Sequence, residues 1–186
     1  MPNNIINASS SGSGGLITTA ADSGSLELQS DGTTIATLSS TGLTMAAGKK
    51  VFSEGSVLQV VSVSKSTEAN TNSTSYVTTG LAATITPKFS TSKILIISNG
   101  SFYGTSTYNS YYTIYRGSTN LEITATRGFA EANFAANTGG IMTLSYLDSP
   151  ATTSATTYTI YTKQSAIVYF PVDGATATIT LLEIAA

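Results

Sequence analysis

The chain has 186 residues and a formal net charge of −2, and only 10% of its residues are charged, against about 25% in ordinary soluble domains. Its Lys and Arg residues do not cluster, so neither nucleic acid nor an anionic membrane is an expected partner. The sequence has no cysteine or histidine, which excludes disulfides, Ser-His-Asp and Cys-His catalysis, and zinc sites built on thiolate or imidazole. A weakly charged, hydroxyl-rich surface suits a part built into a stable assembly.

Residues 1–15 form a polar, Ser/Gly-rich stretch in which Ile5 and Ile6 are adjacent apolar side chains. The stretch has too few apolar residues to fold alone, so we expect a flexible N-terminal arm. It either stays disordered, as termini usually do, or orders against a larger structure through its isoleucines. It lacks the charged and apolar regions of a signal peptide, so secretion by that route is not expected.

Residues 16–55 consist of short apolar segments separated by turn residues, which predicts a short-stranded β extension. Asp31-Gly32 is a two-residue hairpin signal within it. The candidate attachment and trimer-contact residues of this extension are Leu26, Leu28, Ile35 and Leu38. Such a thin apolar stripe cannot form a stable monomeric sheet, because an isolated hairpin is marginal in water. We expect either a bundle of three copies around a shared axis or a loosely ordered β-rich linker.

Glycine and charge gather in residues 46–56, which predicts a junction with a head that spans residues 56–186. Its first strand is expected at 57–65, followed by a polar loop at 66–75. The longest strongly apolar run is Ser92 to Tyr103, and the four residues from Ile94 to Ile97 leave no polar face. This run predicts a central strand that is covered on both faces and ends at Asn99-Gly100.

The rest of the head alternates strand-like runs with turn signals about every ten residues, which predicts an all-β fold, a β-sandwich of the jelly-roll type. Tyr112 and Ile114 are expected on one strand face, opposite Tyr111 and Tyr115. Residues 128–140 have no clear period, although their alanines could form a helical turn. Further strands are expected at 81–86, 121–127, 141–148, 156–165, 166–172 and 175–184, the last with alternating buried Ala, Ile and Leu.

Four phrases between Val57 and Ala186 carry a resemblance: VLQVVSVSK, TSYVTTGLAATITPKFSTSKILIISNGSF, YLDSPATTSATTYTIY and DGATATITLLEI. Together they resemble a module that recurs in structural proteins of tailed bacteriophages, particularly those of marine and freshwater bacteria. The preceding GSLELQSDGTTIATLSSTGLTM is similar to repeats that precede the terminal domains of phage fibres and virion spikes.

This resemblance implies a homotrimeric, non-enzymatic surface protein of the virion, fixed by its N-terminal part and carrying a jelly-roll head like that of tumour-necrosis-factor-like trimers. The leader is short for a long tail fibre, which favours a head-decorating or cement protein, or a short fibre. The implied partners are other virion proteins, either the major capsid protein or the tail and baseplate. The protein would be assembled in the host bacterial cytoplasm and remain in the virion.

Paired carboxylates could still cleave glycosides, which directs attention to the acidic residues of the head. The candidates are Glu122, Glu131, Asp148, Asp173 and Glu183. They share no motif, so we interpret them as solvated loop or trimer-contact carboxylates and expect no catalytic residue. Asp148 and Asp173-Gly174 could offer oxygen ligands to calcium, but no dense acidic loop supports a metal or cofactor site.

Five tyrosines fall within thirteen positions, and they are the most informative polar feature of the head. Tyrosine gives rigid contact area with a polar tip, which serves both protein interfaces and stacking on sugar rings. One interpretation places Tyr112 in the core and most of the others between protomers. The alternative is a receptor-binding adhesin that recognises a host surface glycan through Tyr108, Asn109 and Tyr111.

Overall fold

The computed structural model describes residues 25–49, 51, 53–122 and 127–186. These residues form fourteen strands and no helix, so the chain is all-β as predicted, and among them no helix is long and apolar enough to cross a membrane. The chain divides into two compact units, residues 1–51 and 52–186, and the division lies within the 46–56 stretch where a junction is expected. Ile5 and Ile6 lie outside the described residues.

The first unit holds a three-stranded antiparallel sheet in the order β1-β2-β3. Its strands are β1 (Leu26–Ser30), β2 (Thr33–Ser39) and β3 (Gly42–Met45). The turn between β1 and β2 is the predicted Asp31-Gly32 pair, with φ of 52° and 71°. Positive φ at both central residues is the conformation that matches the twist of a two-residue hairpin, and Asp and Gly adopt it at low cost.

One face of this small sheet is apolar and uncovered within the described residues. Cross-strand pairing places Leu26, Leu38 and Leu43 in one row, and Leu28, Ala36 and Met45 in the next. Leu28, Leu38 and Leu43 remain 44%, 48% and 56% exposed. Ile35 is the extra residue of a β-bulge, since its neighbours Thr34 and Ala36 pair with consecutive residues of β1, and its side chain is half-buried.

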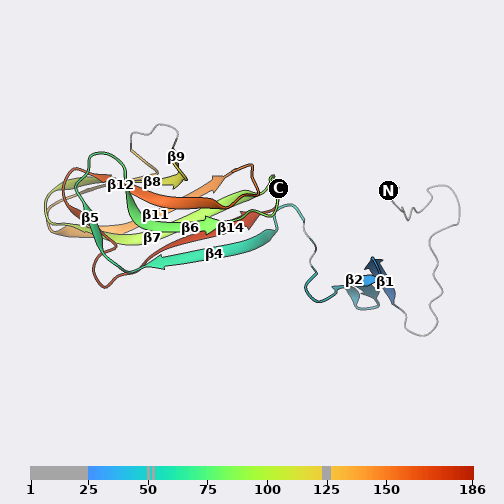
Figure 1. The fold of residues 1–186 in the computed structure, drawn as a ribbon. Coiled ribbons are helices and arrows are strands. Elements are labelled where there is room, and N and C mark those ends of the chain that lie inside the picture. The colour runs from blue at the N-terminus through green and yellow to red at the C-terminus, as the bar shows by residue number, and fades with distance from the viewer. Residues whose placement is uncertain (1–24, 50, 52, 123–126) are drawn as a thin grey trace. The chain divides into compact units, whose positions relative to one another are not determined.

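The second unit, the head, consists of two antiparallel sheets packed face to face as a β-sandwich (Figure 1). The β7 sheet has the order β11-β7-β14-β4; the short strand β13 also pairs with β7, and β5 pairs with β13. The β8 sheet has the order β10-β8-β12-β6, and the short strand β9 also pairs with β8. The strands are β4 (Val57–Lys65), β5 (Ala69–Thr71), β6 (Val77–Ile85), β7 (Lys93–Gly104), β8 (Tyr108–Arg116), β9 (Thr119–Asn120), β10 (Ala130–Phe134), β11 (Thr138–Asp148), β12 (Thr156–Gln164), β13 (Val168–Phe170) and β14 (Ala177–Ile184).

The core lies between the two sheets and is built from alternate residues of each strand. On β14, Ala177, Ile179 and Leu181 are buried while the threonines between them are not, as the sequence pattern predicts. Tyr112 and Ile114 of β8 are buried opposite them. Each large apolar side chain removed from water contributes about 1.5–3 kcal/mol, and this burial is what holds the two layers together.

The apolar run around Ile96 forms the central strand β7, which pairs with β11 on one side and with β14 on the other. The strand does not end at Asn99-Gly100. A Cβ at position 100 would lie 2.5 Å from the Phe170 ring, so the glycine makes room for a core side chain instead of forming a turn. The sequence also predicts that both faces of this strand are covered. Within a single chain only one face is, since Ile96 is buried and Ile97 is 38% exposed.

Residues 119–140 differ from the sequence prediction. The sequence predicts a strand at 121–127, but the short strand found here is β9, at residues 119–120. Residues 123–126 of the expected strand lie outside the described residues. Ala130 and Ala132 lie in strand β10 rather than in a helical turn, because β10 pairs with β8 and Phe134 stacks on Tyr108 with ring centroids 5.8 Å apart. Pairing and aromatic packing here outweigh the modest helix propensity of alanine.

Candidate functional site

A row of four aliphatic side chains crosses the outer face of the β7 sheet. This outer row consists of Val60, Leu182, Leu95 and Leu147, each directly opposite the next on neighbouring strands. Val60 is 57% exposed and Leu147 49% exposed. The adjacent row of Ser62, Thr180, Ile97 and Ser145 is also uncharged. A monomeric protein seldom exposes an apolar band of this kind, so the outer row is a candidate contact surface.

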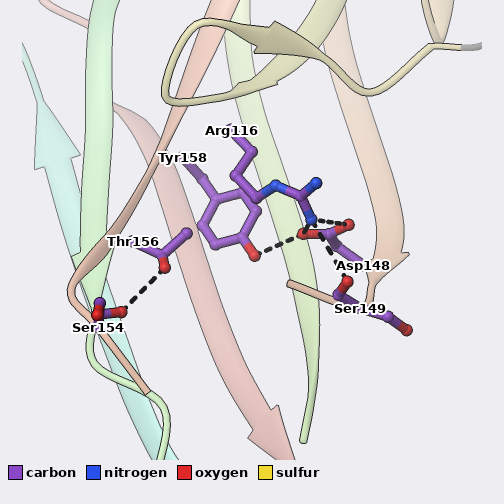
Figure 2. A network of polar contacts seen from close by, with 6 residues as sticks. All are labelled: Arg116, Asp148, Ser149, Ser154, Thr156 and Tyr158. Atoms are coloured by element: carbon purple, nitrogen blue, oxygen red, sulfur yellow. Dashed lines mark hydrogen bonds and ion pairs between the residues drawn. The ribbon is translucent and has the colours of Figure 1, made fainter. Parts of the chain in front are cut away.

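A polar network ties the two sheets together at one end of the sandwich (Figure 2). Asp148, the last residue of β11, accepts hydrogen bonds from Arg116 Nη1 at 2.8 and 2.9 Å and from the Tyr158 hydroxyl at 2.7 Å. Arg116 and Tyr158 belong to the β8 sheet, so the carboxylate bridges the layers. Burial of Tyr158 and its bond to the Asp148 carboxylate raise the pKa of this tyrosine well above its ordinary value.

Asp148 and Glu183 are buried rather than solvated, which corrects their expected place in solvated loops or protomer contacts. Glu183 accepts hydrogen bonds from Gln59 Nε2 and from the backbone N–H of Lys88, both at 2.6 Å. Burial alone would raise the pKa of Glu183, but these hydrogen bonds outweigh burial and lower it. Both carboxylates therefore fasten chain segments inside the sandwich.

Two of the other candidate carboxylates, Glu122 and Glu131, also have polar contacts within the chain. Glu122 Oε2 accepts a hydrogen bond from the backbone N–H of Gly128 at 3.0 Å, and Glu131 pairs with Arg127 at 2.8 Å. Asp173 lies in an exposed turn. No group of three or more carboxylates that could hold a metal ion occurs within the described ranges.

A surface hollow of about 300 Å³ lies at one end of the β8 sheet. Its walls come from the start of β8, the end of β12, the loop between β5 and β6, and the residue preceding Gly128. The hollow is lined by Thr74, Asn109, Tyr111, Arg127, Lys163, Gln164 and Ser165. Neighbouring strands place Lys163 directly opposite Tyr111, so an aromatic ring and an ammonium group meet in this end hollow.

Two cations line the end hollow, and each is positioned by neighbouring side chains. The Lys163 ammonium lies 4.7 Å from the ring centroid of Tyr76 and 5.1 Å from that of Tyr111, within the range of cation–π attraction. The Arg127 guanidinium is held by Glu131, four residues along the chain. In the part of the chain that the structure describes, the hollow is thus lined by two cations and no carboxylate.

The structure separates the residues named for a glycan site. Asn109 and Tyr111 line the end hollow, but Tyr108 does not, because its side chain is only 1% exposed and packs between Phe102 and Phe134. The Tyr108 hydroxyl donates to the backbone oxygen of Thr138 at 3.0 Å, so this tyrosine is a core residue. That is a correction to the sequence interpretation, and its cause is the two-residue period of a strand.

Five lining residues were not identified from the sequence, namely Thr74, Arg127, Lys163, Gln164 and Ser165. Lys163 follows the alternation of β12, in which Tyr158, Ile160 and Thr162 point inward. The sequence therefore contained the signal that Lys163 faces outward, but not that it faces Tyr111. For Thr74 and Arg127, which lie in loops, no local pattern could have identified the hollow.

No known protein family and no curated protein matches the chain in sequence.

Proposed function

We propose that this protein is a non-enzymatic structural protein of a tailed-bacteriophage virion, a homotrimer that decorates or cements the capsid or forms a short fibre. Its leader would attach it to other virion proteins, either the major capsid protein or the tail and baseplate. The virion, assembled in the bacterial cytoplasm, would be its location. The bacteriophage origin rests on the phrase resemblance described above.

We also propose that the head is a jelly roll. Support comes from the strand orders β4-β14-β7-β11 and β6-β12-β8-β10, in which neighbours are mostly distant in the chain. An eight-stranded jelly roll is two such four-stranded antiparallel sheets joined by Greek-key connections. β5, β9 and β13 are short additions to this eight-stranded plan.

The observation that carries the assembly proposal is the outer row together with the uncovered apolar face of the leader. We take the other two copies of this chain as the occupants, since a neutral face of aliphatic and hydroxyl side chains can pack on an uncharged surface of a neighbouring copy without opposite charge. Four strands about 4.8 Å apart and about 30 Å long present roughly 600 Å². A stable interface needs about 800 Å² per partner, so the leader has to contribute as well.

The mass of the protein in solution tests the trimer. Leu95→Asp should give a folded protein that no longer trimerises, because it places a charge in the centre of the outer row. Thr84→Asp, an exposed position on the opposite sheet, is the matched control and should remain trimeric. A wild-type protein that is folded and monomeric by light scattering would contradict the proposal, as would a trimeric Leu95→Asp.

The attachment role of the leader is tested on particles. Labelled full-length protein should bind purified capsids or tails, and electron microscopy would show at which place. Leu28→Asp adds a charge to the uncovered apolar face of the leader and should prevent incorporation, whereas Gln29→Asp, on an exposed neighbouring position, should not. Normal incorporation of Leu28→Asp would argue against attachment through this face.

The end hollow favours a second candidate function, an adhesin that binds a glycan of the host surface. Its support is an aromatic ring, two cations and hydroxyl groups that converge on one concavity, the usual composition of a small-molecule site. Binding of the full-length protein to host cells, and its competition by released surface glycans, tests this function. Cells that bind no protein under any condition would speak against it.

A further inference from the structure

Strands β10 and β11 are the edge strands on one side of the head. Among the described residues, β10 pairs only with β8 and β11 pairs only with β7. The two edges lie next to each other, and a hollow of about 280 Å³ opens between them. The two edges and the hollow together form the seam. Unpaired strand edges invite association, and natural proteins usually cover or blunt them.

The seam hollow reaches the aromatic part of the core. Its apolar lining includes Phe102, Ala130, Ala132, Phe134, Ile141 and Met142. Phe102 and Met142 are each only 3% exposed, so core side chains form its floor. A residue larger than glycine at position 140 would fill part of this space, because a Cβ there would lie 3.0 Å from the Phe102 ring and 3.2 Å from the Phe134 ring. An aliphatic side chain that enters from outside would contact these rings directly.

The rim of the seam is apolar, and its one charged lining residue is paired. Ile141 is 78% exposed, the highest value among the large apolar side chains that the structure describes. Of the residues that line the hollow, only Glu131 is charged, and the Arg127 guanidinium pairs with it at 2.8 Å. An uncharged apolar surface is therefore a better partner for the seam than a charged one.

The symmetry of the proposed trimer requires two different contact surfaces on each copy. In a closed ring of three, each copy meets its two neighbours through different patches, whereas identical patches pack together around a twofold axis and give a dimer. The outer row therefore needs a second patch on the neighbouring copy. Leu147 of the outer row and Ile141 both lie on β11 and face the same side of the sheet, so the outer row and the seam adjoin. Adjoining patches make each copy a wedge, which favours closure into a small ring over an open filament.

We propose that the outer row of each copy packs against the seam of its neighbour, with an aliphatic side chain of that row inserted into the seam hollow. The inference rests on the proposed homotrimer and specifies which surface of the neighbour the outer row contacts. Both sides of the contact are apolar, and each is left exposed by its own chain. The contact removes these side chains from water and covers the edges of β10 and β11, and both effects stabilise the trimer.

The accessibility of position 141 tests this contact in the full-length protein. The sequence has no cysteine, so Ile141→Cys introduces a single thiol, and mass spectrometry follows its reaction with a maleimide. In the trimer this thiol should react about tenfold or more slowly than in a Leu95→Asp background, because a group covered by an interface reacts only when the interface opens. Thr157→Cys, at an exposed position on the outer face of the β8 sheet, is the matched control and should react equally fast in both backgrounds.

A variant that fills the hollow tests the insertion. Ala132→Trp should leave the head folded, because the new ring enters the hollow, and should lower the mass in solution from trimer to monomer. Thr157→Trp is its control and should remain trimeric. If Ala132→Trp lacks a cooperative thermal transition, the smaller Ala132→Leu replaces it, with the same expected fall in mass. A folded, trimeric protein with the hollow filled would overturn the insertion.

The outcomes separate this inference from the proposed trimer. If the wild-type protein is a trimer by light scattering and Ile141→Cys reacts as fast as it does in the Leu95→Asp background, the seam is not covered. In that case the inference fails while the trimer stands. If the wild-type protein is a folded monomer, both fail. A dimer in place of a trimer would indicate that outer row packs on outer row, and it would also overturn both.

Discussion

Asp148→Asn should destabilise the head by about 2–4 kcal/mol, because the substitution removes a carboxylate on β11 that accepts hydrogen bonds from two residues of the opposite sheet. The change keeps the size of the side chain and removes its charge. Hydrogen bonds to a charged group contribute about 1.5–3 kcal/mol each, and Asp148 accepts from Tyr158 and from Arg116. The Tyr158 side chain is fully buried, but the Arg116 side chain is 31% exposed, so water screens part of its contribution.

Urea denaturation at one fixed protomer concentration measures this loss, since an assembling protein changes its apparent stability with concentration. Asp173→Asn, in an exposed turn, is the control and should stay within about 0.5 kcal/mol of wild type. Tyr158→Phe and the Asp148→Asn/Tyr158→Phe double variant complete a cycle whose coupling energy should exceed about 0.5 kcal/mol. A loss below 0.5 kcal/mol for Asp148→Asn, or a coupling energy of zero, would refute the reasoning.

Three other predictions follow from contacts in the head. Ile96→Asp should prevent folding, because an unpaired carboxylate in the core costs several kcal/mol. The control Ile97→Asp, on the outer face of the same strand, should give soluble protein with a cooperative thermal transition. A folded Ile96→Asp protein would contradict this prediction. Gly100→Ala should cost about 1–3 kcal/mol in urea denaturation by pressing on the Phe170 ring, and Phe170→Leu added to it should recover part of the loss, whereas unchanged stability would show that the ring can move aside. The pKa of Glu183 is lowered in the folded protein, so as the pH falls this carboxylate is protonated in the unfolded chain before it is protonated in the folded one. The group therefore adds stability at neutral pH, and this stability is lost as the pH falls below about 4.5 and through the folded-state pKa. Glu183→Gln should make the free energy of unfolding fall less steeply with acid, and an acid dependence identical to that of the wild type would exclude this role.

Strand positions were predictable where one face of a strand is buried and the other is not. The alternation of β14 identified Ala177, Ile179 and Leu181 as core residues, and β4 was expected at the residues where it occurs. The same rule, counted back by twos from Tyr112, places Tyr108 in the core, so that error could have been avoided from the sequence. Asn99-Gly100 could not be read correctly, because the reason for the glycine is a ring seventy residues further along the chain.

The end hollow was only partly predictable for a related reason. The tyrosine cluster pointed to Asn109 and Tyr111, which line it. Lys163 lines the hollow because β12 pairs with β8, and Arg127 lines it because the chain before β10 lies at the same end of the head. The local sequence does not indicate either arrangement. The bridge from Asp148 to Arg116 spans 32 residues and two sheets and was equally invisible.

The place of β4 has a mechanical consequence. Its first residue follows the leader junction, it lies at the edge of the β7 sheet, and it pairs antiparallel with β14 from Val57 to Lys65. A force that pulls the leader and the far end of the head apart acts along this strand. The ladder bonds between β4 and β14 are then strained together, in shear, rather than opened one after another. Forced unfolding is governed by the unfolding rate, so this geometry lets a marginally stable domain resist a sustained pull.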